Sequence, residues 1–360
     1  MLLEIALLII VLWDAYFFFN YIISLLRNYR IKEWAPLVTI IIPAYNEEGT
    51  IKDSIKSALS QDYPTLEVIV VDDGSEDKTF ETASSIKDER LKVFRKKHEG
   101  KAKALNFGLT KAQGEIIVTT DADTVLDNSA VKELVKRFYD EGVLGVGGQV
   151  RVLVSSFLER AQDAEHLRIA MFRRAKELED LSVAPGPISA FRKEALEKIG
   201  GFVKSRVEDY ATTREIKKFG KVVYAPKAKA YTKMPSSLKT LWIQRRRWFL
   251  GDLMHLGGGF SKEWTFLILS DIIALFDVLV PLLLMIRRNW PLLAAFMAFE
   301  IITMLIPTLI EGGGMINALL FPIFLWFWAL FYLTLHIHGY LCLLKSRIAQ
   351  RFPPFLSRKA

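Results

Sequence analysis

The chain has 360 residues, of which 51% are hydrophobic, and its 48 lysine and arginine residues contribute to a net charge of +8. This apolar content is high for a soluble protein, and its excess is concentrated at the two ends of the chain. Because the sequence contains no recognisable nucleic-acid-binding module, the positive charge points to membrane lipids or a phosphorylated substrate. The single cysteine, Cys342, rules out an intrachain disulfide, and we expect it to pack within an apolar segment.

The first 26 residues are nearly all apolar and are followed directly by Arg27, Arg30 and Lys32. A secretory signal would carry positive charge before the apolar stretch and a small-residue cleavage site after it, and the sequence has neither. We therefore expect an uncleaved transmembrane helix. Its basic flank and the domain that follows are expected to lie in the cytoplasm.

A water-soluble α/β domain is predicted from Leu37 to about Pro226. Short runs rich in valine and isoleucine alternate with helical patterns, which is typical of a mostly parallel sheet with right-handed crossovers. The predicted strands are Leu37–Ile42, Leu66–Val71, Lys92–Phe94 and Glu115–Thr120. The predicted helices are Glu48–Gln61, Lys101–Lys111, Ser129–Glu141 and Ser155–Leu181.

Acidic and polar residues follow three of these strands. The strand Glu115–Thr120 ends on Asp121 and Asp123, and the first two strands run into Pro43–Glu48 and Asp72–Asp77. Ligands collect at the carboxyl ends of strands in open α/β sheets, where carboxylates suit a divalent cation. For each segment taken alone, a solvated turn is at least as good an explanation as a ligand-binding site. The three together predict a shared pocket.

A glycine opens the basic helix that precedes the strand Glu115–Thr120. In the segment His98–Asn106, Gly100 comes before Lys101 and Lys103, so backbone N–H groups, helix dipole and lysines are placed to bind phosphates. The spacing is not that of a Walker A loop, which argues against an ordinary ATPase. An exposed basic helix without a ligand explains this segment equally well.

A strongly basic helix is expected over Ser236–Leu256, capped by one of its first two serines. Gln244, Arg247 and Trp248 share one face because they are spaced i, i+3, i+4. That face suits a diphosphate and a sugar ring, whereas an interfacial helix whose other arginines meet lipid head groups is compatible with the same pattern. An apolar stripe, interrupted by Arg245, lies on another face and consists of Leu238, Trp242, Phe249, Leu253 and Leu256.

Three further apolar segments follow: Trp264–Ile286, Trp290–Ile310 and Met315–Leu344. If all three span the membrane, the basic tail ends on the side opposite the α/β domain, against the usual bias of positive charge. Asp271 and Asp277 allow the first of them a re-entrant or interfacial course, so that three and four spans both stay open. The same carboxylates suit either a translocation path or interhelical hydrogen bonds.

Seven motifs stand in the order found in membrane-embedded family 2 glycosyltransferases. The sequence resembles this family, which includes synthases of hyaluronan, chitin, cellulose and poly-N-acetylglucosamine, from about Pro36 to Gly251. The resemblance implies a GT-A nucleotide-sugar-binding domain with a mostly parallel sheet, and transmembrane helices at both ends of the chain. The motifs are Pro-Ala-Tyr-Asn-Glu-Glu from Pro43, Val-Val-Asp-Asp-Gly-Ser from Val70, Gly-Lys-Ala-x-Ala-Leu-Asn from Gly100, Asp-Ala-Asp from Asp121, Gly-Pro-Ile-Ser-Ala-Phe-Arg from Gly186, Glu-Asp from Glu208 and Gln-Arg-Arg-Arg-Trp from Gln244.

The resemblance also implies a role for residues of each motif. Asp209, next to Glu208, is the expected general base, and Asp123, with Asp121 beside it, is the expected ligand of Mg²⁺ or Mn²⁺. The acceptor is expected at Gly186, Ser189 and Trp248. The residues expected to bind the donor, a UDP-sugar, are Pro43, Tyr45, Glu47, Asp73, Lys101, Lys103, Asp121, Gln244 and Arg247.

We therefore expect an inverting, metal-dependent glycosyltransferase that acts as a processive synthase of a β-linked polysaccharide. Transfer of one sugar to a lipid, as in enzymes similar to ceramide glucosyltransferase, is the alternative, and a noncatalytic membrane scaffold or transporter is the least favoured. The expected partners are the donor, a growing glycan or lipid acceptor and membrane lipids, with no nucleic acid; a homo-oligomer stays open. The expected divisions are an N-terminal transmembrane helix (1–33), a cytoplasmic catalytic domain (34–233), an amphipathic interfacial helix (234–262), transmembrane helices (263–345) and a basic tail (346–360).

Overall fold

The computed structural model describes residues 2–26, 34–176, 181, 183–205, 207–255 and 262–351. The chain forms two compact units. The sheet unit holds Ala15–Met234 and Thr303–Ala318, and the helical unit holds Met1–Asp14, Pro235–Ile302 and Leu319–Ala360. The predicted basic flank at residues 27–32 and the last nine residues of the tail lie outside the described residues. The domain boundaries expected from the sequence stay predictions.

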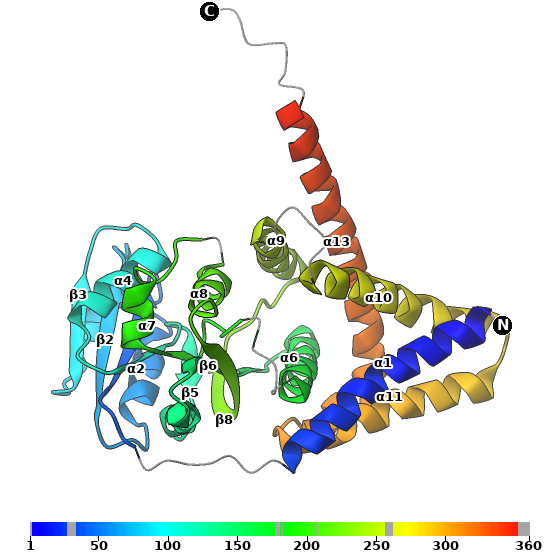
Figure 1. Cartoon of the computed structure of the whole chain (residues 1–360), viewed down its shortest axis with the longest axis horizontal. Helices are drawn as coiled ribbons and strands as arrows, with labels where there is room; N and C mark the ends of the chain where they lie inside the picture. Colours follow the sequence, from blue (N-terminus) through cyan, green and yellow to red (C-terminus); the bar gives the residue numbers. More distant parts are fainter. Residues whose placement is uncertain are drawn as a thin grey trace, which may run out of the picture. The chain divides into compact units, whose positions relative to one another are not determined.

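An eight-stranded sheet forms the centre of the sheet unit (Figure 1). Its strand order is β3-β2-β1-β4-β7-β6-β8-β5. The first four strands of this order are parallel to one another, β7 is antiparallel to both its neighbours, β6 and β8 are parallel, and β5 is antiparallel to β8. The predicted mostly parallel sheet is therefore confirmed. The strands are β1 (Val38–Ala44), β2 (Leu66–Asp72), β3 (Leu91–Arg95), β4 (Ile116–Thr119), β5 (Thr124–Leu126), β6 (Val143–Val152), β7 (Ser189–Arg192) and β8 (Lys221–Thr232).

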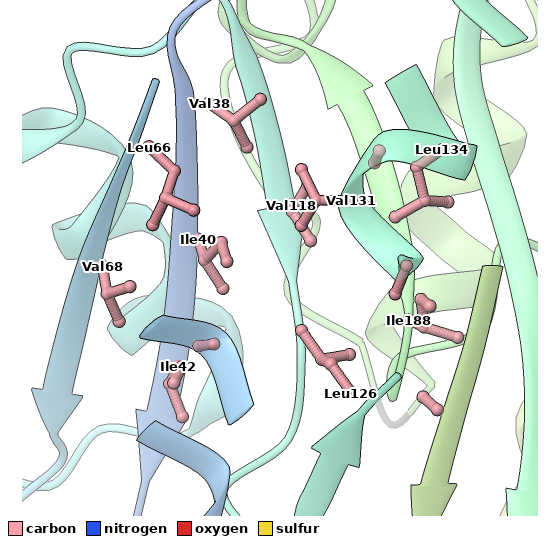
Figure 2. Packing of buried hydrophobic residues seen from close by; sticks show 14 of the residues in the cluster. Val38, Ile40, Ile42, Leu66, Val68, Val118, Leu126, Val131, Leu134 and Ile188 are labelled. Atoms are coloured by element: carbon pink, nitrogen blue, oxygen red, sulfur yellow. The ribbon is translucent and has the colours of Figure 1, made fainter. Parts of the chain in front are cut away.

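Helices cover both faces of this sheet, which explains why its central strands are almost continuous apolar runs. Successive strand residues point to opposite faces. Val38, Ile40 and Ile42 therefore belong to one buried cluster (Figure 2) and Ile41 to another, with Ile117. The helices of this unit are α2 (Ile51–Leu59), α3 (Thr79–Ser84), α4 (Lys101–Lys111), α5 (Ala130–Val135), the 3₁₀ helix η1 (Lys136–Tyr139), α6 (Phe157–Ala175), α7 (Lys193–Lys198) and α8 (Glu208–Ile216).

A buried carboxylate ties two apolar segments to the sheet unit. Glu311, which is 2% exposed, follows α11 (Trp290–Ile310) and accepts hydrogen bonds from Tyr21 of α1 (Leu2–Leu25) at 3.0 Å and from Arg174 of α6 at 2.8 Å. Its backbone carbonyl accepts from Arg151 at 2.8 Å and from Lys229 at 2.9 Å. The end of α1 and the turn after α11 are thereby fixed to α6, β6 and β8.

In the part of the chain that the structure describes, four helices are long and apolar enough to cross a membrane, and their apolar parts are Leu2–Leu25, Trp264–Ile286, Trp290–Ile310 and Phe321–Leu344. The predicted transmembrane helices at both ends of the chain are confirmed, and the chain is a multi-pass membrane protein. The remaining helices after the sheet unit are α9 (Leu238–His255), α10 (Lys262–Ile286), α12 (Met315–Leu319) and α13 (Phe321–Arg351).

The buried face of α9 differs from the predicted stripe. Arg245, which is 2% exposed, belongs to this face instead of interrupting it, whereas Leu238 is 58% exposed. The Arg245 guanidinium lies 4.2 Å from the ring centroid of Trp248 and 5.8 Å from that of Trp328, and its flat charge stacks favourably on aromatic rings. The alternative in which Arg245 meets lipid head groups is therefore wrong. Leu256 of the predicted stripe lies outside the described residues.

Asp271 of α10 makes interhelical hydrogen bonds, one of the two roles predicted for it. Its carboxylate lies 2.5 Å from His336 Nδ1 and accepts from the Tyr340 hydroxyl at 2.8 Å, both on α13. These bonds join α10 to α13 within the helical unit.

Candidate active site

Asp73, directly after β2, organises the loop that leads into α4. Its buried carboxylate accepts hydrogen bonds from Lys96 Nζ at 2.8 Å and from the backbone N–H of Gly100 at 2.7 Å, and His98 Nδ1 lies 2.9 Å away. Burial alone would raise the pKa of Asp73, but the bond from Lys96 and the backbone N–H groups outweigh it and lower this pKa. Gly100, at φ +96°, brings its backbone to the carboxylate in a conformation that a residue with a side chain rarely adopts. Contact of Asp73 with a nucleotide stays a prediction.

An aromatic platform stands beside this carboxylate. The rings of Tyr45, after β1, and His98 stack with centroids 4.1 Å apart and planes 30° apart. Tyr45 is 41% exposed, so part of its side chain is accessible to a ligand. A flat exposed ring next to hydrogen-bonding groups is suited to a nucleotide base.

Lys101, the first residue of α4, joins two carboxylates from distant parts of the chain. Its Nζ lies 2.6 Å from Asp121 Oδ1, beyond β4, and 2.7 Å from Glu208 Oε1, at the start of α8. Burial would lower the pKa of Lys101, but the charges of Asp121, Glu208 and Asp209 outweigh burial and hold this pKa above its usual value. Lys101 is therefore a permanent positive charge at the centre of an acidic site.

Asp209 is held by backbone N–H groups. Its Oδ2 accepts from Gly186 N at 3.1 Å and its Oδ1 from Tyr210 N at 2.8 Å. Burial and then the charge of Glu208 raise the pKa of Asp209, and Lys101 opposes them. A carboxylate whose pKa is raised toward neutrality is a stronger base than an ordinary one, which is what general-base catalysis requires.

Both acceptor residues predicted on the sheet unit border the same small cavity. It has a volume of about 10 Å³, and its lining includes Gly186, Ser189, Lys101, Glu208 and Asp209. The Ser189 hydroxyl pairs across the sheet with that of Thr119 at 2.8 Å. A β-carbon at position 186 would lie 3.0 Å from Lys101 Nζ and 3.7 Å from Asp209 Oδ2. Glycine therefore keeps the space between these groups open.

Asp123 lies in surroundings that favour a bound cation. Burial, followed by the charges of Asp121 and Glu47, raises the pKa of Asp123 to about 6. Its other partners are the hydroxyls of Thr124 and Thr232, each at 3.3 Å. Among the described residues, no three His, Cys, Asp or Glu side chains gather as a complete metal site. Asp121 and Asp123 nevertheless supply carboxylate oxygens, the ligand type that Mg²⁺ and Mn²⁺ prefer, and they would hold such an ion together with other ligands.

The other predicted donor residues take different positions. Pro43 is buried within β1, where it pairs with Val71, and Lys103 is exposed on the first turn of α4. The carboxylate of Glu47 accepts from the Thr50 hydroxyl at 2.6 Å. Gln244, Arg247 and Trp248 belong to the helical unit, so their place at this site stays a prediction.

Sequence reasoning did not select Lys96 and His98, which contact Asp73. Their position in the sequence could have identified them, because they directly follow β3, just as the other polar segments of the site follow β1, β2 and β4.

Residues 39–200 match the family model described as Glycosyl transferase family 2. The chain therefore contains a glycosyl transferase family 2 domain, and the resemblance drawn from its motifs is confirmed. The mannosyltransferase PcManGT from Pyrobaculum calidifontis, solved with GDP-Man and Mn²⁺, aligns with a TM-score of 0.60 at 22% identity, over 98% of this chain and 100% of that one. This similarity shows the fold, and the predicted GT-A fold is confirmed.

Two named relatives share this domain. The poly-β-1,6-N-acetyl-D-glucosamine synthase of Staphylococcus epidermidis is 32% identical over 230 residues, which cover 59% of this chain and 54% of that protein. The synthase of the same name from Staphylococcus aureus strain MSSA476 is 31% identical over 222 residues, covering 59% of this chain and 54% of the relative. The chain thus spans about half the length of the curated relatives it matches.

Proposed function

We propose that this protein is an inverting, metal-dependent glycosyltransferase that uses a UDP-sugar. The observation that carries the proposal is the position of Asp209, which accepts a hydrogen bond from Gly186 and lines one small pocket together with Lys101. The family 2 domain around this pocket supports the same reaction class.

Asp209 acts as the general base. It removes the proton of an acceptor hydroxyl, whose oxygen attacks the anomeric carbon of the donor sugar while the bond to the UDP oxygen breaks. One displacement from the opposite face inverts the anomeric carbon. The raised pKa of Asp209 matches this role because the proton then moves to a more basic oxygen.

The donor is held by residues at the carboxyl ends of β1, β2 and β4. Tyr45 and His98 receive the base, the Asp73 loop receives the ribose, and Lys101 provides positive charge for the diphosphate. Gln244 and Arg247 add polar contacts to the donor, and Trp248 stacks on the acceptor sugar.

A divalent cation, Mg²⁺ or Mn²⁺, fits at Asp123 and Asp121. Five carboxylates lie near one another at this site: those of Glu47, Asp121, Asp123, Glu208 and Asp209. Lys101 pairs with two of them, Asp121 and Glu208. An anionic diphosphate is repelled by such a site unless a cation balances the charge. When bound, the ion would neutralise the charge that grows on the leaving UDP.

The substrate proposal follows the named relatives. Because poly-β-1,6-N-acetyl-D-glucosamine synthases are 31–32% identical to the aligned part of this chain, we infer UDP-N-acetylglucosamine as donor and a β-linked polysaccharide made processively as product. We also propose that the catalytic domain lies in the cytoplasm, because the positive-inside bias favours the cytoplasm for the basic residues that follow α1.

Membranes containing the protein, supplied with labelled UDP-N-acetylglucosamine, UDP-glucose or UDP-glucuronate and Mg²⁺ or Mn²⁺, test this proposal. We expect high-mass, β-linked label from UDP-N-acetylglucosamine. Label that is soluble in organic solvent would establish single-sugar transfer to a lipid instead. If no donor supports turnover under conditions where the protein is folded, a noncatalytic role is favoured.

A further inference from the structure

The motif that opens α4 ends on a residue that the proposed reaction does not use. This residue, Asn106, follows Lys101 by five positions on the same helix. Its side-chain amide makes two hydrogen bonds to one residue 96 positions away: Nδ2 donates to Phe202 O at 2.9 Å, and Oδ1 accepts from Phe202 N at 2.7 Å. An amide supplies both the donor and the acceptor that this pairing needs, whereas an aspartate of the same shape lacks the donor.

Phe202 belongs to a short strap, residues 200–203, between α7 and α8. Gly200 and Gly201, at φ +80° and +96°, begin the strap, and their N–H groups donate to carbonyls of α7. A β-carbon on Gly201 would lie 2.3 Å from Asn106 Oδ1, so glycine is needed for the strap to approach α4 this closely. The chain therefore leaves α7 in a direction that brings it directly against α4.

The other end of the strap is bonded to α8. Val203 N donates to the hydroxyl of Thr212 at 3.0 Å, and Thr212 is 1% exposed. α8 carries Glu208 and Asp209 in its first turn, so Thr212 lies one turn after the carboxylate proposed as the general base. The strap thus connects α4 on one side with α8 on the other through hydrogen bonds to its own backbone.

The same three segments are walls of the small cavity at Asp209. The lining of this cavity includes Leu105 of α4, Phe202 of the strap and Thr212 of α8. Phe202 is 5% exposed, and its ring meets that of Phe191 in β7 edge to face, with centroids 6.2 Å apart. A shift of the strap would therefore change the shape of the cavity as well as the separation of the two helices.

We propose that Asn106 is a positioning residue, which acts through the strap to hold the base Asp209 on α8 at a fixed place relative to Lys101 on α4. This inference rests on the proposed function, because it concerns the base and the donor-side charge of that reaction. Lys101 also pairs with Glu208 at 2.7 Å, so α4 and α8 are joined at two places. A diphosphate that binds Lys101 competes with this ion pair, whereas the amide contact of Asn106 is left intact and keeps α8 in place.

The effect on the reaction follows from the geometry that a general base requires. The base must lie within hydrogen-bond reach of the acceptor hydroxyl, and a displacement of about 1 Å can cost about 10²-fold in rate. Donor binding depends on Tyr45 and the loop around Asp73, which Asn106 does not contact in the described structure. Loss of the amide should therefore lower the rate of transfer and leave the affinity for UDP unchanged.

Asn106→Ala in the full-length protein tests the proposal by three measurements on one preparation. Transfer is followed with UDP-N-acetylglucosamine, UDP binding with Mn²⁺ is measured by calorimetry, and backbone hydrogen exchange is followed over residues 201–212. We expect kcat to fall by about 10²-fold, UDP affinity to stay at the parent value, and exchange of the strap and α8 to become faster. Asn128→Ala, the same substitution at an exposed position outside the cavity, should match the parent in all three.

A double variant tests whether Asn106 acts through the strap. Thr212→Val removes the hydroxyl that accepts from Val203 and keeps the shape of the side chain, so alone it should give the same pattern as Asn106→Ala. Because both changes cut one connection, their losses of transfer should not multiply when they are combined. Thr212→Val also keeps the proposal testable if Asn106→Ala does not fold.

Three results would overturn the proposal: parent kcat in Asn106→Ala, a loss of UDP affinity equal to the loss of transfer, or losses that multiply in the double variant. Hydrogen exchange needs no turnover. A parent protein that transfers no sugar would therefore contradict the proposed function, while unchanged exchange of the strap in Asn106→Ala would contradict the positioning role by itself.

Discussion

Lys101 Nζ lies 2.6 Å from Asp121 Oδ1, so the lysine that opens α4 is paired with a carboxylate predicted to flank the metal. The same amine lies 2.7 Å from Glu208. This arrangement connects the donor side of the site, at the end of β4, with the base side, at the start of α8. A change at Lys101 should therefore alter the pKa of Asp209.

The acid limb of the pH profile should move in opposite directions in two variants. Transfer needs Asp209 ionised, and its pKa is raised, so activity should fall as the pH drops through that raised value. Glu208→Gln removes a charge that raises this pKa and should shift the limb to lower pH. Lys101→Met removes a positive charge that lowers the pKa of Asp209, so it should shift the acid limb to higher pH. The position of the limb is measured from kcat/KM as a function of pH.

Lys111→Met, at the exposed end of α4, is the matched control and should leave the limb in place. Shifts of the same sign in Glu208→Gln and Lys101→Met would contradict the assignment of Asp209 as the group that titrates.

Tyr45→Ala should weaken UDP binding, because it removes the exposed ring that stacks on His98. Base stacking on an aromatic side chain is worth about 1–3 kcal/mol, so we expect a loss of affinity of roughly 5- to 150-fold by calorimetry. Tyr45→Phe keeps the ring and should bind UDP nearly as well as the parent. Equal losses in both variants would assign the effect to the hydroxyl group.

Asp123→Asn should abolish the dependence of UDP binding on Mn²⁺. The pKa of Asp123 is raised to about 6 without a cation, so a bound cation should displace a proton at or below that pH. Calorimetry in buffers of different ionisation enthalpy should detect proton release near pH 6 in the parent and not in the variant. Asp62→Asn, a change at an exposed surface carboxylate, should behave like the parent.

Glu311→Gln should destabilise the sheet unit. Its carboxylate pairs with Arg174, and the two side chains are 3% and 11% exposed, so the variant removes the negative charge from a mostly buried ion pair. Removing one partner of a buried pair typically costs about 3–5 kcal/mol, which should appear as a lower thermal midpoint in detergent.

Glu197→Gln, at a carboxylate that is 60% exposed, should leave the midpoint unchanged. The double variant Glu311→Gln with Arg174→Met should recover part of the loss. If the two losses simply add, the pair does not account for the stability.

Strong local patterns made part of the fold predictable. The helix Lys101–Lys111 is observed with its predicted bounds, because Gly100 marks its start, and β1, β2, β3 and β4 agree within two residues with their predicted ranges. β6 and β8 were not predicted. β6 contains glycines at positions 145, 147 and 148, where a β-carbon would lie within 3.0 Å of a neighbouring atom, and β8 contains Pro226, which argues against a strand.

Tertiary partners were the part of the site that the sequence could not supply. Motif order selected Lys101, Asp121, Glu208 and Asp209, but only folding shows that one amine bridges two of the carboxylates. Arg245 shows the same limit, because its burial depends on Trp328, which is 83 positions away in the sequence.

The most direct test of the central claim compares Asp209→Asn with the parent. Transfer from UDP-N-acetylglucosamine and calorimetric binding of UDP with Mn²⁺ are measured on the same preparations. The account predicts that transfer falls by about 10²- to 10⁴-fold while UDP affinity is unchanged. Transfer at the parent rate, or a loss of UDP binding that matches the loss of transfer, would contradict the assignment of Asp209 as the base.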